Sequence, residues 1–288
     1  MKVLIVDRQR YKPCDYGLSF KEGLKKHGLD AELVHSNKPQ RNSYDLVMGW
    51  GIRTIESLQH LSYPTYIVAE RGYLGNRKHY TSFGYNGLNG HANFCNKNMS
   101  SDRFEKHFKH LYKEWNNEGE YILLALQSRN DKSIAHLFDQ TGNKYYQNLL
   151  DKLKSLTSIP ILVREHPRNF LGKKCWNLDK ANYQNDEDDT LIDNPIENAI
   201  ENARWVVTVN SSSGVDATLW GKPCINIDPT GSMVKDIAFT NFDQINEKVS
   251  EPINRLQWAY NMSYTQWNKK EIVNGDAWDH LKRYYDQN

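Results

Sequence analysis

Residues 205–223 read WVVTVNSSSGVDATLWGKP, and the fold predicted for the whole chain depends on this stretch. The apolar, β-branched run at 206–209 is typical of a buried strand, and apolar side chains return at helical spacing from Val215 to Trp220. Between them lie three consecutive serines. Their hydroxyls can cap a helix or, together with the unpaired N–H groups of its first turn, bind a phosphate. The pattern therefore predicts a strand, a tight turn and a helix, and leaves both roles of the serines open.

A second polar turn follows another apolar run. Residues 161–163 are Ile, Leu and Val, and the chain continues as REHPR at 164–168. Four ionisable groups within five positions are hard to explain by packing, because burying an unpaired charge costs roughly several kcal/mol. In open α/β sheets the ligand crevice lies beyond the carboxyl ends of the strands. Both turns fall at such ends, so the sequence predicts that they share a binding site.

Alternating strand and helix patterns predict two α/β domains. Strand patterns at 3–6, 31–35 and 44–48 surround an amphipathic helix at 16–27, and short connections of this kind are typical of a doubly wound parallel sheet. A helical pattern that begins at Asp102 ends in the sequence NNEG. We therefore predict a Rossmann-like domain at 1–117, a second Rossmann-like domain at 118–255, and C-terminal helices at 256–288 that pack back across both.

The two turns also carry a family resemblance. A strand that ends in His-Pro, followed about 40 residues later by one that ends in Asn-Ser-Ser and then by Gly, Ala, Leu and Gly-Lys-Pro, resembles the donor-binding half of GT-B glycosyltransferases. The similarity is greatest to the capsular Kdo transferases and the bacterial sialyl- and polysialyltransferases. It covers about residues 120–230, and the non-hydrolysing sugar epimerases share the architecture. The resemblance implies an α/β, GT-B-like fold in which two Rossmann-like, doubly wound parallel-sheet domains face each other across a cleft.

The resemblance further implies a nucleotide-sugar site on the second domain. In the capsular transferases a Gln and a downstream Asp-x-Ser follow the corresponding strand, and Gln127, Asp131 and Ser133 match them here, although Ser133 is equally suited to cap a helix. We expect a UDP-sugar donor, with His166 and Arg164 neutralising the charge of the leaving nucleotide. No cofactor beyond the donor and no obligatory metal is expected. The predicted donor-binding residues are Gln127, Arg129, Asp131, Ser133, Arg164, His166, Asn210, Ser211, Ser212, Ser213 and Gly214.

The segment 76–94 is the predicted acceptor-binding loop. It has few aliphatic residues and mixes glycines with aromatic and basic side chains, and long irregular loops are uncommon unless they are functional or disordered. The predicted acceptor-binding residues are Trp50, Arg71, Tyr73, Arg77, His79, Tyr80, Asn86 and Asn89. Trp50 is placed to stack on a sugar or a base, and core packing explains it equally well. The sequence ERGY at 70–73, followed by NGLNG at 86–90, also resembles small phage glycosyltransferases.

Three residues are predicted to be catalytic: Glu70, Asp15 and His166. Glu70 follows an apolar strand pattern and is the first candidate for the general base that takes the proton of the acceptor hydroxyl, with Asp15 and His79 as further candidates. The alternative for Glu70 is a structural ion pair with the neighbouring Arg71.

The charge distribution bears on the acceptor. The net charge is +2, but residues 1–115 hold 18 Lys and Arg against 11 Asp and Glu, whereas residues 116–288 hold 19 against 24. A basic front half is either an ordinary solvated surface or a surface for an anionic acceptor, and nucleic acid is the first candidate. We therefore predict sugar transfer to a hydroxymethylated or already glycosylated pyrimidine in phage DNA. The alternatives are a capsule or lipopolysaccharide glycosyltransferase, a sugar-nucleotide epimerase and a non-catalytic nucleic-acid-binding protein.

Composition and length exclude several other classes. Aromatic residues make up 12% of the 288 residues, which argues against disorder, and no apolar run is long enough to span a membrane. The first residues resemble a strand and not a signal peptide, so we expect a soluble, cytoplasmic monomer, in the host cytoplasm if the protein is viral. Four widely spaced cysteines indicate neither a zinc site nor a disulfide framework, and the acidic run at 186–189 is more typical of a solvated turn than of a metal site.

Overall fold

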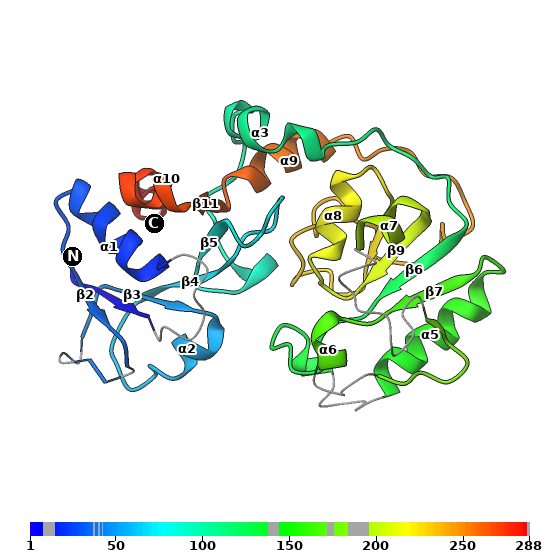
Figure 1. The fold of residues 1–288 in the computed structure, drawn as a ribbon, viewed down its shortest axis with the longest axis horizontal. Coiled ribbons are helices and arrows are strands. Elements are labelled where there is room, and N and C mark those ends of the chain that lie inside the picture. Colours follow the sequence, from blue (N-terminus) through cyan, green and yellow to red (C-terminus); the bar gives the residue numbers. More distant parts are fainter. Residues whose placement is uncertain are drawn as a thin grey trace. The chain divides into compact units, whose positions relative to one another are not determined.

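The computed structural model describes residues 1–7, 15–36, 38–39, 41, 43–137, 144–171, 176–183 and 196–286. Contacts divide the chain into two compact units (Figure 1). Unit 1 contains Met1–Lys109 and Ala259–Asn288, and unit 2 contains His110–Trp258. The C-terminal segment that the sequence analysis treated separately is therefore counted with unit 1. Each unit is built on a sheet with parallel strands, as the predicted α/β class requires.

The sheet of unit 1 has six strands in the order β11-β5-β4-β3-β1-β2. Its strands are β1 (Val3–Val6), β2 (Ala31–Val34), β3 (Leu46–Trp50), β4 (Thr65–Arg71), β5 (Tyr80–Tyr85) and β11 (Gln266–Asn268). Its helices are α1 (Tyr16–Lys26), α2 (Ile52–Glu56), α3 (Asp102–His107), α10 (Lys269–Asn274), α11 (Asp276–Leu281) and α12 (Arg283–Asp286), with a 3-10 turn η1 (Asn89–His91). Strands β1 to β4 pair in parallel, which confirms the strand patterns predicted at the amino terminus.

The segment 76–94 differs from the irregular loop that the sequence predicted. Residues 80–85 form β5, which pairs antiparallel with both β4 and β11. All residues from Thr81 to Tyr85 are buried, so both faces of this strand are covered. Gly84 was interpreted as a loop residue, but it lies within the strand. A Cβ at this position would lie 2.6 Å from the Ala92 Cβ, so the glycine permits close packing there.

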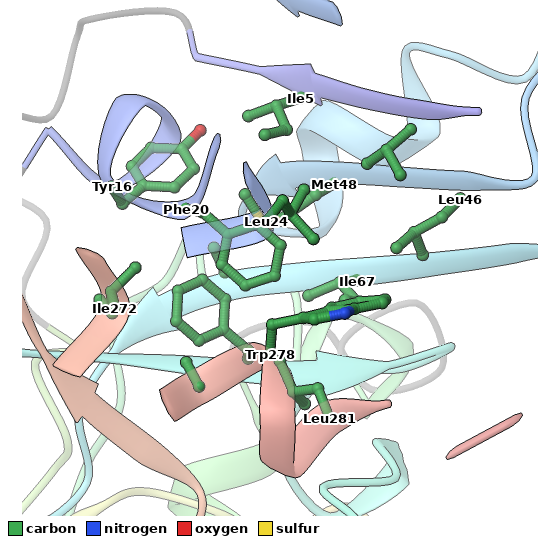
Figure 2. Close-up of a cluster of buried hydrophobic side chains, with 14 of the residues drawn as sticks. Ile5, Tyr16, Phe20, Leu24, Leu46, Met48, Ile67, Ile272, Trp278 and Leu281 are labelled. Carbon is green, nitrogen blue, oxygen red and sulfur yellow. The ribbon is translucent and has the colours of Figure 1, made fainter. Parts of the chain in front are cut away.

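The core of unit 1 is closed by the end of the chain. Figure 2 shows side chains of α1 and of strands β1, β3 and β4 packed against Ile272, Trp278 and Leu281. Trp278 is 4% exposed, and its ring lies edge-on to that of Phe20, with 6.2 Å between centroids. Because such aromatic side chains bury large apolar areas, α10 and α11 contribute to the core of unit 1 together with the first strands.

Unit 2 has a five-stranded, fully parallel sheet in the order β10-β9-β6-β7-β8. Its strands are β6 (Tyr121–Ala125), β7 (Ile161–Arg164), β8 (Asn182–Tyr183), β9 (Ala203–Thr208) and β10 (Cys224–Asn226). Its helices are α5 (Lys144–Leu156), α6 (Pro167–Leu171), α7 (Ile196–Glu201) and α8 (Ser213–Leu219), and a 3-10 turn η2 (Lys109–Leu111) and α9 (Arg255–Ser263) cross the two boundaries with unit 1. The strand, turn and helix predicted from 205–223 are present as β9, the serine turn and α8.

The Gly-Lys-Pro sequence after α8 holds the segment that leads into β6. The Gly221 carbonyl accepts a hydrogen bond from the Asn116 amide at 2.7 Å, and the Lys222 Nζ donates to the Glu118 carbonyl at 2.8 Å. Gly221 has a φ of 76°, and a Cβ there would lie 1.9 Å from the Glu114 carbonyl oxygen. Since this turn precedes β10, it lies at the amino end of that strand. Its glycine is explained by a backbone contact within unit 2.

Gly221→Ala should destabilise the protein far more than Gly28→Ala, although both glycines have a left-handed φ, 76° and 70°. A Cβ on Gly28 meets nothing within 4 Å, so that variant carries the backbone cost alone, about 1–2 kcal/mol. Gly221→Ala adds a clash with a carbonyl oxygen, which should cost about 1–3 kcal/mol more. Urea unfolding measures the free energy of unfolding of both variants. Equal losses of stability would contradict the close contact between Gly221 and the Glu114 carbonyl.

Candidate functional site

The polar loops of unit 2 meet at the carboxyl edge of its sheet. All five strands run in parallel, and β6 lies between β7 and β9, so the segments that follow these three strands are neighbours. Backbone hydrogen bonds join them: the Leu126 amide donates to the Arg164 carbonyl at 2.9 Å, and the Asp228 amide donates to the Val209 carbonyl at 3.0 Å. This edge is where α/β sheets bind their ligands.

Asn210 connects the segments along this edge. Its side chain is 4% exposed, and its Oδ1 accepts hydrogen bonds from Gln127 Nε2 at 2.8 Å and from Ser133 Oγ at 2.9 Å. Its Nδ2 donates to the Ser133 carbonyl and to Asp228 Oδ2, both at 3.0 Å. Since two donors face the amide oxygen and two acceptors face the amide nitrogen, the orientation of the side chain is fully determined.

Gln127, Asp131 and Ser133 form one cluster with Asn210. Gln127 Oε1 accepts from the main-chain amide of Asn210 at 3.0 Å, so the Gln127 side chain bonds both the main chain and the side chain of Asn210. Asp131 Oδ1 accepts from the Ser133 amide at 2.9 Å and, at 2.8 Å, shares the single Ser133 hydroxyl proton with Asn210 Oδ1, while Asp131 Oδ2 accepts from Gln127 Nε2 at 3.2 Å. The structure thus brings together three residues that were predicted from motif similarity, and their part in donor binding stays a prediction.

The serine turn begins directly after Asn210. The Ser211 hydroxyl accepts a hydrogen bond from the Ser213 amide at 3.2 Å, and the Ser212 side chain does not cap α8. Ser213 is 3% exposed, and its hydroxyl has no hydrogen-bond partner among the described residues. Gly214 fits closely, because a Cβ there would lie 3.3 Å from the Cys224 Sγ. The turn therefore presents two half-buried serines and one buried, unsatisfied hydroxyl at the edge of the sheet.

His166 is held as a neutral imidazole. Its Nδ1 accepts a hydrogen bond from the Arg168 amide at 3.1 Å, so the proton of the neutral ring is on Nε2. Burial, assisted by the positive charge of Arg168, lowers the pKa of His166 to about 4. At neutral pH the ring offers an N–H donor without a positive charge. This differs from the expectation that His166 neutralises phosphate charge, unless the bound anion itself raises the pKa.

Two predicted arginines lie beneath the same edge. Arg164 is the last residue of β7 and is 4% exposed. The Arg129 guanidinium lies over the Trp176 ring, 4.7 Å from its centroid, and its amide donates to Asn169 Oδ1 at 3.3 Å. Arg129 Nε is buried without a hydrogen-bond partner among the described residues. Arg129 therefore has donor capacity that the surrounding protein does not use.

Asp228, which follows β10, was missed as a site residue. Its Oδ1 accepts from the Gly231 amide at 2.9 Å and from the Thr230 amide at 3.1 Å, while Oδ2 accepts from Asn210. Burial opposes the charge, but these hydrogen bonds outweigh it and lower the pKa of Asp228. The turn DPTG at 228–231, directly after a strand, is the sequence signal that marks this position.

The predicted catalytic carboxylates of unit 1 lie at the carboxyl edge of its sheet. Glu70 is half-buried near the end of β4, and a Cβ on Gly51 would lie 3.2 Å from its Oε1. Its carboxylate therefore packs against the backbone that begins α2. Asp15 is exposed, has a φ of 32°, and lies 3.6 Å from the Lys269 Nζ. Both remain candidates for the base.

Most of the predicted acceptor-binding residues serve the packing of unit 1. The Tyr73 hydroxyl donates to Asn89 Oδ1 at 3.1 Å, and burial, together with the charge of Glu70, raises its pKa. Asn86 Oδ1 accepts from the Tyr66 amide, and its Nδ2 donates to the Tyr284 hydroxyl. Trp50 packs against Tyr16, Tyr80 against Phe108, and Arg77 Nε donates to the Tyr73 carbonyl. Arg71 and His79 are exposed. Their role in acceptor binding is therefore still a prediction.

The described part of the chain contains neither a grouping of metal ligands nor a membrane-spanning helix. Within it, no three His, Cys, Asp or Glu side chains are grouped to hold a metal ion, and no helix is long and apolar enough to cross a membrane. Cys95 and Cys224 are buried free thiols. Cys14, Cys175 and the acidic run at 186–189 lie outside the described residues. The expectation of metal-free catalysis stays untested.

Comparisons with known proteins agree with this architecture. The solved structure of Thermosulfurimonas dismutans KpsC, beta Kdo 2,4 transferase, matches with a TM-score of 0.59 and 15% identity over 95% of this chain and 97% of that one. Thermosulfurimonas dismutans KpsC, beta Kdo 2,7 transferase, matches with a TM-score of 0.52 and 12% identity over 96% and 98%. The fold is that of the GT-B class of glycosyltransferases.

The chain belongs to the family of capsule polysaccharide biosynthesis proteins, whose model matches residues 54–227. No curated protein sequence matches significantly. The predicted enzyme class, glycosyltransferase, agrees with this family and with both transferases. The predicted phage-DNA acceptor has no support from these similarities, and the capsule alternative fits them better.

Asn210→Asp should destabilise unit 2 in a pH-dependent way. The new oxygen would face Asp228 Oδ2 and the Ser133 carbonyl at about the 3.0 Å distances that Nδ2 now has. At pH 7 two buried carboxylates would repel each other, and we expect a loss of about 2–4 kcal/mol. Their proximity raises the folded-state pKa of the pair, so stability should recover as the pH falls towards 4.5.

Urea unfolding at pH 7 and pH 4.5 measures this effect. Asn202→Asp is the control, because Asn202 is exposed and its Nδ2 donates only to the Asn198 carbonyl, at 3.3 Å. A loss of stability at pH 7 no greater than that of the control would show that Asn210 Nδ2 does not face the two acceptors.

His166→Asn should reduce the acid sensitivity of unit 2. The folded-state pKa of about 4 lies below the ordinary histidine value of 6.5, so the unfolded chain takes up a proton first as the pH falls. The stability linked to the neutral ring is complete above pH 6.5 and is lost as the pH falls towards 4. The variant should lose about 1–3 kcal/mol less than the wild type between pH 7 and 4.5. Urea titrations measure it, with His79→Asn as an exposed control; identical slopes would refute the burial of His166.

Proposed function

We propose that this chain transfers a sugar from a nucleotide-sugar donor to a hydroxyl group of a capsule or related cell-surface glycan. The observation that carries the proposal is the convergence, at one edge of unit 2, of the polar segments that follow β6, β7, β9 and β10. Asn210 hydrogen-bonds to residues of the first and last of these segments. The family supplies the substrate class, because its members are capsule polysaccharide biosynthesis proteins.

The donor phosphates bind at the serine turn in this proposal. Ser211 and Ser212 are half-buried and lie at the edge, and Ser213 has a hydroxyl without a protein partner among the described residues. The His166 Nε2–H adds a neutral donor. As the bond between the anomeric carbon and the phosphate oxygen breaks, negative charge grows on the leaving nucleotide. Fixed donors at that position stabilise the transition state more than the bound donor substrate.

The acceptor binds at the carboxyl edge of unit 1 in this proposal. Its hydroxyl oxygen forms the new bond to the anomeric carbon, and Glu70 accepts its proton. A single displacement with a general base inverts the anomeric centre. Arg71, Lys78 and His79 are exposed in the segment after β4, which favours an acidic glycan over a neutral one. An acidic glycan accounts for the basic surface that first suggested DNA.

The test is an activity panel with purified full-length protein. UDP-sugars and nucleotide-activated Kdo are offered with acidic capsule oligosaccharides, with neutral oligosaccharides and with hydroxymethylated DNA, and mass spectrometry detects the products. We expect transfer to an acidic oligosaccharide. Transfer to DNA alone would restore the DNA acceptor, and conversion of a donor without any acceptor would indicate an epimerase.

A double variant ties the activity to the serine turn. Ser211→Ala with Ser212→Ala should lower kcat/KM by about 100-fold, since donors to a developing charge carry effects of this size. Ser155→Ala is the control, because Ser155 is an exposed residue of α5 whose hydroxyl donates to the Lys152 carbonyl. Equal activity in the two variants would place the donor elsewhere.

A further inference from the structure

Glu165 is a buried carboxylate that the proposed reaction does not use. It lies between β7 and His166 and is 2% exposed. Burial raises its pKa, so keeping the charged form at this position costs free energy. A buried acid that is only filling space is replaced without loss by an apolar side chain. The contacts of Glu165 explain its presence better than packing does.

Both carboxylate oxygens of Glu165 accept hydrogen bonds. Oε2 accepts from Asn169 Nδ2 at 2.6 Å, and Oε1 accepts from the Trp176 amide at 2.5 Å. The two donors come from α6 and from the segment that precedes β8. An ionised carboxylate, which has acceptors alone, is well suited to satisfy both of them at once.

Asn169 and Trp176, which bind Glu165, also bind the start of the segment that follows β6. Trp176 Nε1 donates to the Gln127 carbonyl at 2.9 Å, and Asn169 Nδ2 lies 3.4 Å from the same oxygen. Asn169 Oδ1 also accepts from the Arg129 amide at 3.3 Å. The main chain at 127–129 is therefore fixed by the Asn169 side chain, which Glu165 orients, and by the Trp176 side chain, whose main-chain amide Glu165 holds.

Gln127 links these hydrogen bonds to the serine turn. Its side chain is bonded reciprocally to Asn210, at 2.8 and 3.0 Å, and one of these bonds holds the Asn210 main-chain amide. Ser211 is the next residue. A continuous series of hydrogen bonds thus runs from Glu165 through Asn169 and Trp176 to Gln127, and from Gln127 to the start of the turn.

We propose that Glu165 is a positioning residue for the donor site: its carboxylate orients Asn169 and Trp176, which fix Gln127 and, through Asn210, the serine turn. The proposal rests on the proposed function for the identity of the ligand. A purely structural role predicts something different. Loss of Glu165 would then lower stability and loosen its own segment at 165–178, but it would leave the serine turn ordered.

The test uses Glu165→Gln in the full-length chain. The amide has nearly the same shape, but one acceptor becomes a donor that faces another N–H group. Hydrogen exchange of backbone amides should accelerate about tenfold or more in two segments, 127–133 and 210–214. Calorimetric titrations with UDP and with CMP should show an affinity for the better of the two that is about tenfold weaker than in the wild type.

Two further variants separate positioning from stability. Lys222→Met removes a buried charge of the same unit, 4% exposed, at the amino end of β10, and should leave exchange at 210–214 unchanged. Trp176→Phe removes the Nε1–H donor to Gln127 and keeps the amide that binds Glu165. It should reproduce the effect on 210–214 if Glu165→Gln does not fold.

The outcomes are distinct. Faster exchange confined to 165–178, or unchanged exchange at 210–214 in both Glu165→Gln and Trp176→Phe, overturns the proposal. If the wild type binds neither nucleotide while the variant accelerates exchange at 210–214, the positioning role stands and the proposed donor site fails. If the wild type binds and the variant binds equally well, Glu165 does not position the donor.

Discussion

The candidate donor site depends on the reciprocal pair of hydrogen bonds between Gln127 and Asn210. These residues follow β6 and β9, and their side chains are 3% and 4% exposed. A buried polar atom that lacks a partner costs about 1–3 kcal/mol, so the loss of either side chain removes a partner that the other residue uses. Ser133, Asp131 and Asp228 belong to the same hydrogen-bond network. Both the oxygen and the nitrogen of the Asn210 side-chain amide therefore have their partners within the protein. The conformation of the serine turn is thereby set before any ligand binds, which reduces the entropy cost of binding.

Each unit also depends on one buried arginine that joins distant parts of the chain. In unit 1, Arg103 forms a bidentate pair with Glu271 and lies 4.0 Å from the centroid of the Trp267 ring. In unit 2, Arg255 donates to the carbonyls of Thr218, Leu219 and Lys113. A guanidinium has five N–H donors in a fixed geometry, so one side chain satisfies several carbonyls that have no strand or helix partner. The contacts of Arg103 join residues of the C-terminal segment to α3 of unit 1, in agreement with the place of that segment in unit 1.

The sequence was most informative where local chemistry determines structure. The β-branched run of β9, the serine turn and α8 were predicted because a buried parallel strand and an amphipathic helix have distinct patterns. The segment 76–94 was wrongly expected to be irregular, because the glycine in β5 marks a close contact with Ala92 that only the tertiary structure shows. Asn86 was expected to contact an acceptor, and its partner Tyr284 lies 198 positions away in sequence. Polar residues whose partners are this distant look like ligand-binding residues in a sequence, because nothing local indicates that they are already satisfied.

The neutral state of His166 constrains how unit 2 can bind an anion. A protonated imidazole at this position would repel Arg168 and lose hydration, which is why the pKa is low. The ring therefore adds hydrogen bonding without electrostatic attraction when a phosphate first arrives. In the proposed reaction, negative charge accumulates on the leaving oxygen, and a charge-assisted hydrogen bond from the ring would become favourable at that moment. A group that becomes a better partner only as the bond breaks stabilises the transition state more than the ground state, and differential stabilisation of this kind is what raises kcat. The burial of His166 would therefore suit the departure of the nucleotide in the proposed reaction better than the binding of a resting phosphate.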